Sequence, residues 1–384
     1  MSKAKIYPSQ PTNEMKATTL LHDLGQSLWV DNITRDLLDQ GTLKRYIDEL
    51  SVTGLTSNPT IFEQAIKNST AYDQDICAKL KQDEPAEQIF FELALADLTR
   101  AADLFRPIYE RTNGVDGLVS LEVSPLLAYD TAGTVAAATD LFAKAGRPNV
   151  FIKIPGTKEG LLAVEEAIFA GVPVNVTLLF SQEQYLAAAE AFLRGIERRI
   201  ASGLKANVGS VASVFVSRWD AAIKDKVPAK LRNRLGIAIA SSTYKAARRL
   251  LSSSRWERIY SAGAWPQRLV WASTGVKDPT APEVLYVKAL AAPFTINTMP
   301  EGTLKALSEQ TELGSIMAES GDSCEGVLAE ITDAGIDIDI LAGRLQEEGA
   351  KAFARSWNSL MEVIASKRAL LERSSAAEMK GQSI

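Results

Sequence analysis

Short runs of apolar and β-branched residues recur along the chain, and stretches with the periodicity of amphipathic helices separate them. Eight such runs occur, at residues 28–31, 52–58, 117–124, 149–155, 172–180, 208–217, 268–274 and 293–299. Near-continuous apolar strands alternating with helices are typical of a parallel sheet covered by helices. Eight strand–helix units close into a barrel, so the pattern predicts an α/β protein of the (β/α)8, or TIM-barrel, class.

The intervening helices carry recognisable start and stop signals. Ser181 with Gln184 matches the pattern of a capping box. Two helices, 131–146 and 157–171, are each predicted to end at a glycine shortly before the next strand. A longer helix over 86–111 is predicted to interrupt the rhythm between the second and third strands.

The residues after the eighth run predict further helices. The stretch LAGRLQEEGAKAFARSWNSLMEVIASKRALL places apolar residues, including Phe353 and Trp357, at helical spacing. We therefore expect residues 300–384 to form a C-terminal helical extension packed on the barrel. Residues 1–25 are expected to form an N-terminal segment outside the repeating units. With no low-complexity linker in the sequence, 1–384 is predicted to be one domain.

The composition excludes several classes of protein. The formal net charge is −5, which leaves no general basic face for a polyanion, so we expect no nucleic-acid partner. No stretch approaches the roughly 18 apolar residues of a membrane span, and the N-terminus lacks an apolar leader. The two cysteines, Cys77 and Cys324, have neither disulfide nor zinc-site spacing. These features predict a cytoplasmic protein.

His22 is the only histidine in the chain. A single histidine disfavours nucleophile–histidine systems and multi-histidine metal centres, so proton transfer is expected to fall to Asp, Glu, Lys, Tyr or water. Asp337 and Asp339 form a DxD pattern, but they precede an amphipathic helix, where capping is the favoured interpretation. We expect no metal and no cofactor.

Polar residues gather at the predicted carboxyl ends of the strands, which is where barrels of this class carry their chemistry. They are Asp31, Asn32, Thr56, Ser57, Asn58, Glu122, Ser124, Lys153, Asn175, Thr177, Ser213, Arg218, Ser273, Thr274 and Lys277.

Lys153 stands within an otherwise apolar strand. Strand alternation turns Ile152 and Ile154 toward the helices and Lys153 into the barrel. Burial disfavours the ammonium ion and favours the neutral amine, which is the form that attacks a carbonyl. The alternative is a structural ion pair with Glu122 or Asp31, and the strand pattern alone does not separate the two interpretations.

Glu122 and Asp31 could supply the acid and base that Schiff-base chemistry requires, or they could simply balance charge. Four further side chains suit a polyhydroxylated substrate or could satisfy backbone groups: Asn58, Asn175, Thr177 and Ser213. The turn after the seventh strand, ASTGVKDP, lies where many barrels bind phosphate, and Arg218 could add a charged contact.

The sequence resembles the transaldolase family, specifically its longer bacterial type, from about residue 26 to residue 370. The resemblance rests on six motifs in order: LWVDNITRD, GLTSNPTIF, SLEVSP, IKIPGT, NVTLLFS and SVFVSRWD. It implies a class I aldolase barrel in which Lys153 forms the Schiff base, Glu122 and Thr177 hold a catalytic water, and Asp31 is the acid/base at the cleaved carbon.

The resemblance also implies the substrate contacts. Asn58, Asn175 and Ser213 would bind the dihydroxyacetone moiety, and Thr56 lies in the same group of motifs. Arg218, Ser273 and Lys277 would bind phosphate, with Lys277 standing where shorter relatives carry an arginine. Phe215 matches the transaldolase pattern, whereas the related fructose 6-phosphate aldolases tend to carry tyrosine there.

The implied reaction transfers a dihydroxyacetone unit from sedoheptulose 7-phosphate to glyceraldehyde 3-phosphate, giving erythrose 4-phosphate and fructose 6-phosphate in the pentose phosphate pathway. The alternatives are a fructose 6-phosphate aldolase-like enzyme, a pyridoxal-phosphate enzyme on the same fold, and a catalytically silent barrel that binds sugar phosphates. Either a monomer or a homodimer is compatible with the sequence.

Overall fold

The computed structural model describes residues 15–80, 84–318 and 324–381. Its centre is a closed barrel of parallel strands in the order β1-β2-β3-β4-β5-β6-β7-β8, which confirms the predicted fold class. The strands are β1 (Ser27–Asp31), β2 (Val52–Thr56), β3 (Leu118–Glu122), β4 (Val150–Pro155), β5 (Val174–Leu179), β6 (Ser210–Phe215), β7 (Arg268–Ala272) and β8 (Ile296–Met299). Seven of them lie within a predicted run, and β1 begins one residue before its run.

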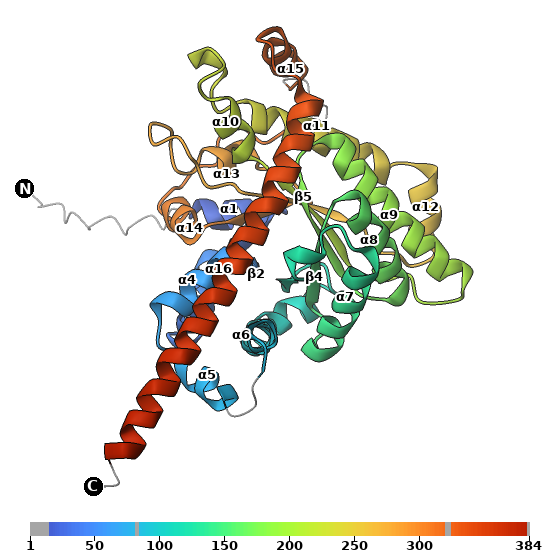
Figure 1. Cartoon of the computed structure of the whole chain (residues 1–384). Coiled ribbons are helices and arrows are strands. Elements are labelled where there is room, and N and C mark those ends of the chain that lie inside the picture. Colours follow the sequence, from blue (N-terminus) through green and yellow to red (C-terminus); the bar gives the residue numbers. More distant parts are fainter. Residues whose placement is uncertain (1–14, 81–83, 319–323, 382–384) are drawn as a thin grey trace, which may run out of the picture.

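Helices surround the barrel and connect its strands (Figure 1). They are α1 (Ala17–Asp23), α2 (Arg35–Asp39), α3 (Thr42–Leu50), α4 (Pro59–Asn68), α5 (Asp73–Leu80), α6 (Ala86–Arg111), α7 (Thr131–Ala145), α8 (Lys158–Ala170), α9 (Gln182–Ala201), α10 (Ser217–Ile223), α11 (Leu235–Leu251), α12 (Ser254–Ser261), α13 (Leu285–Ala289), α14 (Glu301–Ser308), α15 (Cys324–Asp333) and α16 (Ile338–Gly381), with 3-10 helices η1 (Pro125–Leu127) and η2 (Ala229–Leu231).

The local signals in the sequence form as predicted. Ser181 and Gln184 make a reciprocal capping box at the start of α9. Gly146 and Gly171 end α7 and α8 in the left-handed conformation, which glycine adopts without steric cost. Of the predicted N-terminal segment 1–25, residues 1–14 lie outside the described residues and the remainder contains α1.

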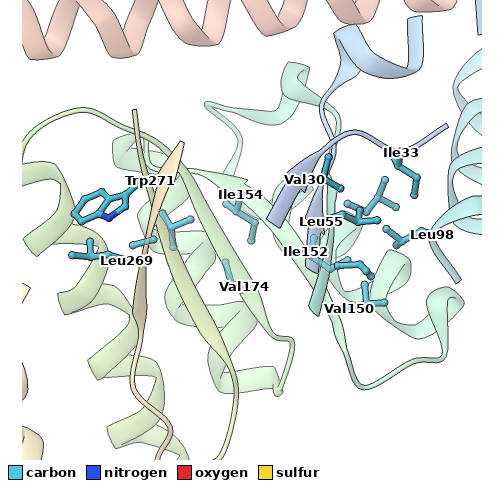
Figure 2. Packing of buried hydrophobic residues seen from close by; sticks show 14 of the residues in the cluster. Val30, Ile33, Leu55, Leu98, Val150, Ile152, Ile154, Val174, Leu269 and Trp271 are labelled. Atoms are coloured by element: carbon cyan, nitrogen blue, oxygen red, sulfur yellow. The ribbon is translucent and has the colours of Figure 1, made fainter. Parts of the chain in front are cut away.

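The strands turn alternate side chains into and out of the barrel. Outward-facing residues such as Ile152 and Ile154 pack with the surrounding helices, in the cluster that Figure 2 shows. The inward-facing residues near the amino ends of the strands form a second apolar layer, made of Trp29, Leu118, Phe151, Val211, Val270 and Ile296. Two residues further along, the inward positions are polar on β1, β3, β4, β6 and β8, whereas β7 has Ala272 there. The polar site therefore lies above an apolar layer.

A buried arginine closes the amino end of the barrel. Arg268 donates from Nη2 to Ser27 Oγ at 2.7 Å and to the carbonyl of Thr295 at 2.9 Å. Ser27 in turn donates to the carboxylate of Asp116, which also accepts from the indole of Trp29 at 3.0 Å. This network joins β1, β7 and the approach to β3, and it lies opposite the end that carries the candidate chemistry.

The predicted C-terminal extension contains α14, α15 and α16. Helix α16 is a long helix that runs across the barrel in Figure 1, and it contacts β5, η1, α4, α5 and α6. Gln346 of α16 donates to the carbonyls of Gly156 and Leu178, which follow β4 and lie in β5. Helix α16 therefore passes over the carboxyl ends of the strands.

Candidate active site

Lys153 lies inside the barrel near the carboxyl end of β4. Its side chain is buried, with the residue 5% exposed. The Nζ atom donates to the carbonyl of Ser57 at 3.1 Å and to Glu122 Oε2 at 3.3 Å. The ring of Phe353, from α16, has its centroid 5.6 Å from Nζ. The inward orientation predicted from the strand pattern is therefore the one the structure has.

Glu122 is the neighbour of Lys153 in the pairing of β3 with β4. Burial raises the pKa of the Glu122 carboxyl, while the adjacent lysine opposes that rise. Its second oxygen, Oε1, is buried and has no hydrogen-bond partner among the described residues, and the same is true of Thr177 Oγ1 on β5. A carboxyl beside an amine with part of its hydrogen-bonding capacity unused is suited to proton transfer.

Asp31 ends β1 and accepts hydrogen bonds from residues at the carboxyl end of β2. Thr56 donates to one carboxylate oxygen at 2.8 Å and Asn58 to the other at 3.4 Å. Desolvation raises the pKa of Asp31, while Lys153 and the two hydrogen bonds oppose the rise. Since the intervening residue Ser57 accepts from Lys153, three consecutive residues position both the acid and the amine.

Asn58 has a second role at the start of α4. Its Oδ1 accepts from the backbone N–H of Ile61 at 3.1 Å, so its side chain is the N-cap of the helix. The cap fixes the side chain, and its amide nitrogen can then face Asp31. The two interpretations of Asn58 that the sequence left open, a backbone partner and a site residue, are therefore compatible.

Asn175 and Ser213 form a buried polar wall on the next strands. Ser213 donates to Asn175 Oδ1 at 2.7 Å, and Asn175 Nδ2 donates to Ser120 Oγ at 3.2 Å. The register pairs Lys153 directly with Asn175. The amide is therefore oriented from both sides, and this wall stands beside the amine.

Arg218 and Ser273 approach the site from the far side of the barrel. Arg218 lies at the start of α10, with its guanidinium 5.4 Å from the ring centroid of Phe215 and 6.0 Å from that of Phe353. Ser273 follows β7 in the left-handed region, with φ of 55°, and its hydroxyl lies 3.0 Å from that of Ser217. Both residues therefore stand at the carboxyl end of the barrel, as predicted.

Lys277 is exposed and has no direct contact with the buried cluster. It lines a cavity of about 250 Å³ outside β6 and β7, together with Ser217, Asp220, Lys224, Arg232, Asn233 and Tyr286. Ser217 contacts both this cavity and Ser273, so Lys277 is adjacent to the predicted phosphate region. The structure thus places ten of the eleven predicted catalytic and substrate-binding residues at the carboxyl end of the barrel and leaves Lys277 at their edge.

Several contacts at the site were not predicted from the sequence. Ser57 contributes a carbonyl, a group that side-chain chemistry does not reveal, and Ser120 is hidden within an apolar strand. Thr298 of β8 lies 2.6 Å from the hydroxyl of Thr56. Phe353 belongs to the C-terminal extension, outside the strand pattern, and its apolar side chain does not distinguish it from the other apolar residues of α16.

The DxD pattern has the structural role predicted for it. Asp337 Oδ1 accepts from the N–H of Ile340, which confirms capping at the start of α16. The parts of the chain that the structure describes contain no group of three or more metal-ligating side chains. Nor is any helix within them long and apolar enough to span a membrane. His22 lies on α1, before β1, with its side chain about half exposed at 49%.

Comparison with known proteins gives consistent matches over most of the chain. A family model described as transaldolase/fructose-6-phosphate aldolase matches residues 28–364. Transaldolase 2 of Nostoc sp. is 39% identical over 370 residues, covering 91% of this chain and 97% of the relative. The transaldolase of Arthrobacter sp. is 42% identical over 353 residues (90% and 95%), and that of Thiobacillus denitrificans is 40% identical over 358 residues (91% and 100%). The chain belongs to the transaldolase/fructose-6-phosphate aldolase family.

Proposed function

We propose that this protein is a transaldolase that moves a dihydroxyacetone unit between sugar phosphates through a Schiff base on Lys153. The observation that carries the proposal is the buried Lys153 amine, which is in contact with Glu122 and faces the interior of the barrel. A lysine amine at this position can reach a ketone bound inside the barrel, and the neutral amine is the form that attacks a carbonyl. The donor is sedoheptulose 7-phosphate or fructose 6-phosphate, and the acceptor is an aldose phosphate.

Formation of the imine requires protons to be delivered and removed. Lys153 attacks the ketone carbon, and the resulting carbinolamine loses its hydroxyl as water. Glu122 gives the departing hydroxyl its proton through a water held between Glu122 Oε1 and Thr177 Oγ1, both of which are buried with unused hydrogen-bonding capacity. The raised pKa of Glu122 supports this role, because a carboxyl whose pKa is closer to neutral pH can both give and take a proton.

Cleavage of the carbon–carbon bond is assigned to Asp31. Its carboxylate takes the proton from the hydroxyl of the cleaved carbon, an aldehyde forms there, and the bonding electrons pass to the iminium nitrogen to give an enamine. The same steps in reverse join the enamine to an acceptor aldehyde, and Asp31 returns the proton. Water then hydrolyses the imine and frees the new ketose. The chain's own residues supply every proton transfer, so the proposal includes no metal and no cofactor.

The proposed substrate contacts come from the buried polar residues beside Lys153 and from the cationic residues near the ends of β6 and β7. Asn58, Asn175 and Ser213 would bind hydroxyls of the dihydroxyacetone moiety, and Thr56 would orient Asp31. Arg218, Ser273 and Lys277 would bind the phosphate. Lys277 reaches it from the neighbouring cavity, past Ser217. The phosphate thus stays at the rim, while the reacting carbons lie at Lys153. The proposed substrate contacts are therefore Asn58, Thr56, Asn175, Ser213, Arg218, Ser273 and Lys277.

Transfer is favoured over simple aldol cleavage by the residue at the end of β6. Phe215 packs on Phe180, with ring centroids 5.2 Å apart, and it offers no hydroxyl to the site. A fructose 6-phosphate aldolase would release dihydroxyacetone, which requires a proton at the enamine carbon. Measurement of free dihydroxyacetone with and without an acceptor aldehyde distinguishes the two activities.

The proposal extends to the setting of the enzyme. We expect 1–384 to act as one domain, in the cytoplasm where sugar phosphates are metabolised, and as a monomer or homodimer with no nucleic-acid partner. Sedimentation analysis of the purified chain separates the two oligomeric states.

The test is covalent trapping. Incubation with fructose 6-phosphate and borohydride should reduce the imine to a stable adduct, and peptide mapping should find it on Lys153. Lys153→Met should lose both the adduct and the transfer activity. Lys158→Met, at an exposed position on α8, should keep both. An active Lys153→Met variant, or an adduct on another lysine, would contradict the proposal.

A further inference from the structure

Helix α16 forms hydrogen bonds to residues on both sides of the carboxyl end of the barrel. On one side, Gln346 Nε2 donates to the carbonyls of Gly156 and Leu178 at 3.0 and 2.9 Å. On the other side, Ser356 accepts from Thr60 at 2.9 Å. Gln346 and Ser356 are ten residues apart, which is about 15 Å along the helix. Phe353 lies between them.

The approach of α16 to the barrel is close because it carries a glycine at the crossing point. A Cβ atom at Gly349 would lie 3.0 Å from Leu178 Cδ2 and 3.4 Å from an Nη atom of Arg218. Leu178 itself has a φ of 58°, a conformation that is costly for leucine, and α16 binds its carbonyl. The helix is therefore fitted to the end of β5, next to Thr177.

Phe353, on α16, lies close both to the Lys153 amine and to the Arg218 guanidinium. Its ring centroid is 5.6 Å from Lys153 Nζ and 6.0 Å from the guanidinium of Arg218. It is 7% exposed and packs in the cluster that includes Phe180 and Phe215. One ring thus covers the Lys153 amine and one side of the Arg218 guanidinium, which lies at a distance where a cation and an aromatic face attract each other.

We propose that Phe353 is a specificity-determining residue, which shields the covalent intermediate on Lys153 from water and so directs it toward an aldehyde acceptor. The inference rests on the proposed function. An apolar cover over a reactive intermediate suppresses its hydrolytic loss.

The reaction that Phe353 would suppress is the release of dihydroxyacetone after water protonates the enamine. Protonation of the enamine carbon by water forms a C–H bond, with the electron pair supplied from nitrogen, and leaves an iminium ion and hydroxide. Addition of water to the iminium and expulsion of the Lys153 amine then release dihydroxyacetone. Transfer instead forms a C–C bond to the acceptor carbonyl. The ratio of the two products therefore reports access of water to the enamine.

The experiment compares three variants with the wild type. Fructose 6-phosphate serves as donor and erythrose 4-phosphate as acceptor, and both free dihydroxyacetone and sedoheptulose 7-phosphate are quantified. Phe353→Ala should raise the ratio of release to transfer by about tenfold or more, the size of effect that an opened apolar pocket gives. Phe353→Leu, which keeps an apolar side chain of intermediate size, should give a smaller rise.

Leu360→Ala is the matched control. Leu360 is a fully buried residue of the same helix that belongs to the other core cluster, so its truncation loosens α16 without opening the site. It should lower stability and leave the product ratio unchanged. An equal rise in Leu360→Ala, or an unchanged ratio in Phe353→Ala, overturns the inference. If Phe353→Ala does not fold, Phe353→Leu decides in the same way.

Failure of the proposed function has a separate signature. If the wild-type protein yields no borohydride adduct on Lys153, the proposed function is wrong. If the wild type forms the adduct and transfers normally while both Phe353 variants keep its product ratio, only the role of Phe353 is wrong.

Discussion

Asp220 provides a quantitative test of how the helix bearing Arg218 is held in place. It lies in α10 and is only 4% exposed. Its carboxylate accepts from the N–H groups of Leu235 and Gly236, at 2.9 and 3.2 Å, and from the hydroxyl of Tyr286 at 2.9 Å. Burial outweighs these bonds and raises the pKa of Asp220 from 3.8 to about 6.

The sign of the pH effect follows from that rise. The folded protein binds the Asp220 proton more tightly than the unfolded chain, so the contribution to stability is fully present below the unfolded pKa and is lost as the pH rises through about 6. The difference between 3.8 and about 6, at about 1.36 kcal/mol per tenfold change in proton affinity, corresponds to ~3 kcal/mol in total. Roughly half of this loss falls between about pH 5 and about pH 8.

The assay compares wild type with Asp220→Asn, which cannot titrate. Denaturant unfolding of both proteins, followed by tryptophan fluorescence at several pH values, gives the difference in unfolding free energy at each pH. The wild type should lose stability relative to the variant as the pH rises. Asp278→Asn is the control, because hydrogen bonds from Thr280 and Asn233 lower the pKa of Asp278 to about 2, below this range. A wild-type-minus-Asp220→Asn difference that stays constant from pH 5 to pH 8 would refute the reasoning.

Three further substitutions test the site and the barrel. Asp31→Asn should lower kcat by about 10²–10⁴-fold and remove the fall in activity at acidic pH, because the carboxylate must be ionised to take a proton and its pKa is raised; the pH–rate profile checks this, and retention of the wild-type acidic limb would count against it. Arg218→Met should raise KM for a phosphorylated ketose by about tenfold to a hundredfold, the value of a charge-assisted hydrogen bond. Trapping of unphosphorylated dihydroxyacetone on Lys153 should not change, and an equal loss with both compounds would contradict the phosphate role. Arg268→Met should cost ~3–5 kcal/mol of unfolding free energy, because it removes the buried charge that is linked to Asp116 through Ser27 and leaves the carbonyls of Val115 and Thr295 without their donor. Addition of Asp116→Asn should recover part of that loss in the same unfolding assay.

The barrel itself was predictable because each of its units is encoded locally. Apolar strand runs, the capping residues Ser181 and Gln184, and the helix-ending glycines are properties of a few adjacent residues. Strand alternation also determined which way Lys153 points, since a neighbour of two outward-facing isoleucines must face inward. In a closed parallel barrel all strands end at the same rim, which brings residues as distant as Asp31 and Ser273 to one end of the fold.

Contacts between units depended on the tertiary structure. The carbonyl of Ser57 reaches Lys153 only because β2 and β4 curve around a common axis, and a carbonyl is present at every position of a sequence. The position of Lys277 outside the buried cluster is decided by the path of the turn after β7, and residue spacing does not determine that path. Phe353 lies 200 residues after Lys153 in the sequence, and nothing in its own periodicity distinguishes it from any other apolar helix residue. The sequence by itself therefore determined the barrel and the residues facing its rim, because these follow from local periodicity; only the tertiary structure decided which of them touch and what covers them, because that depends on where α16 crosses the barrel.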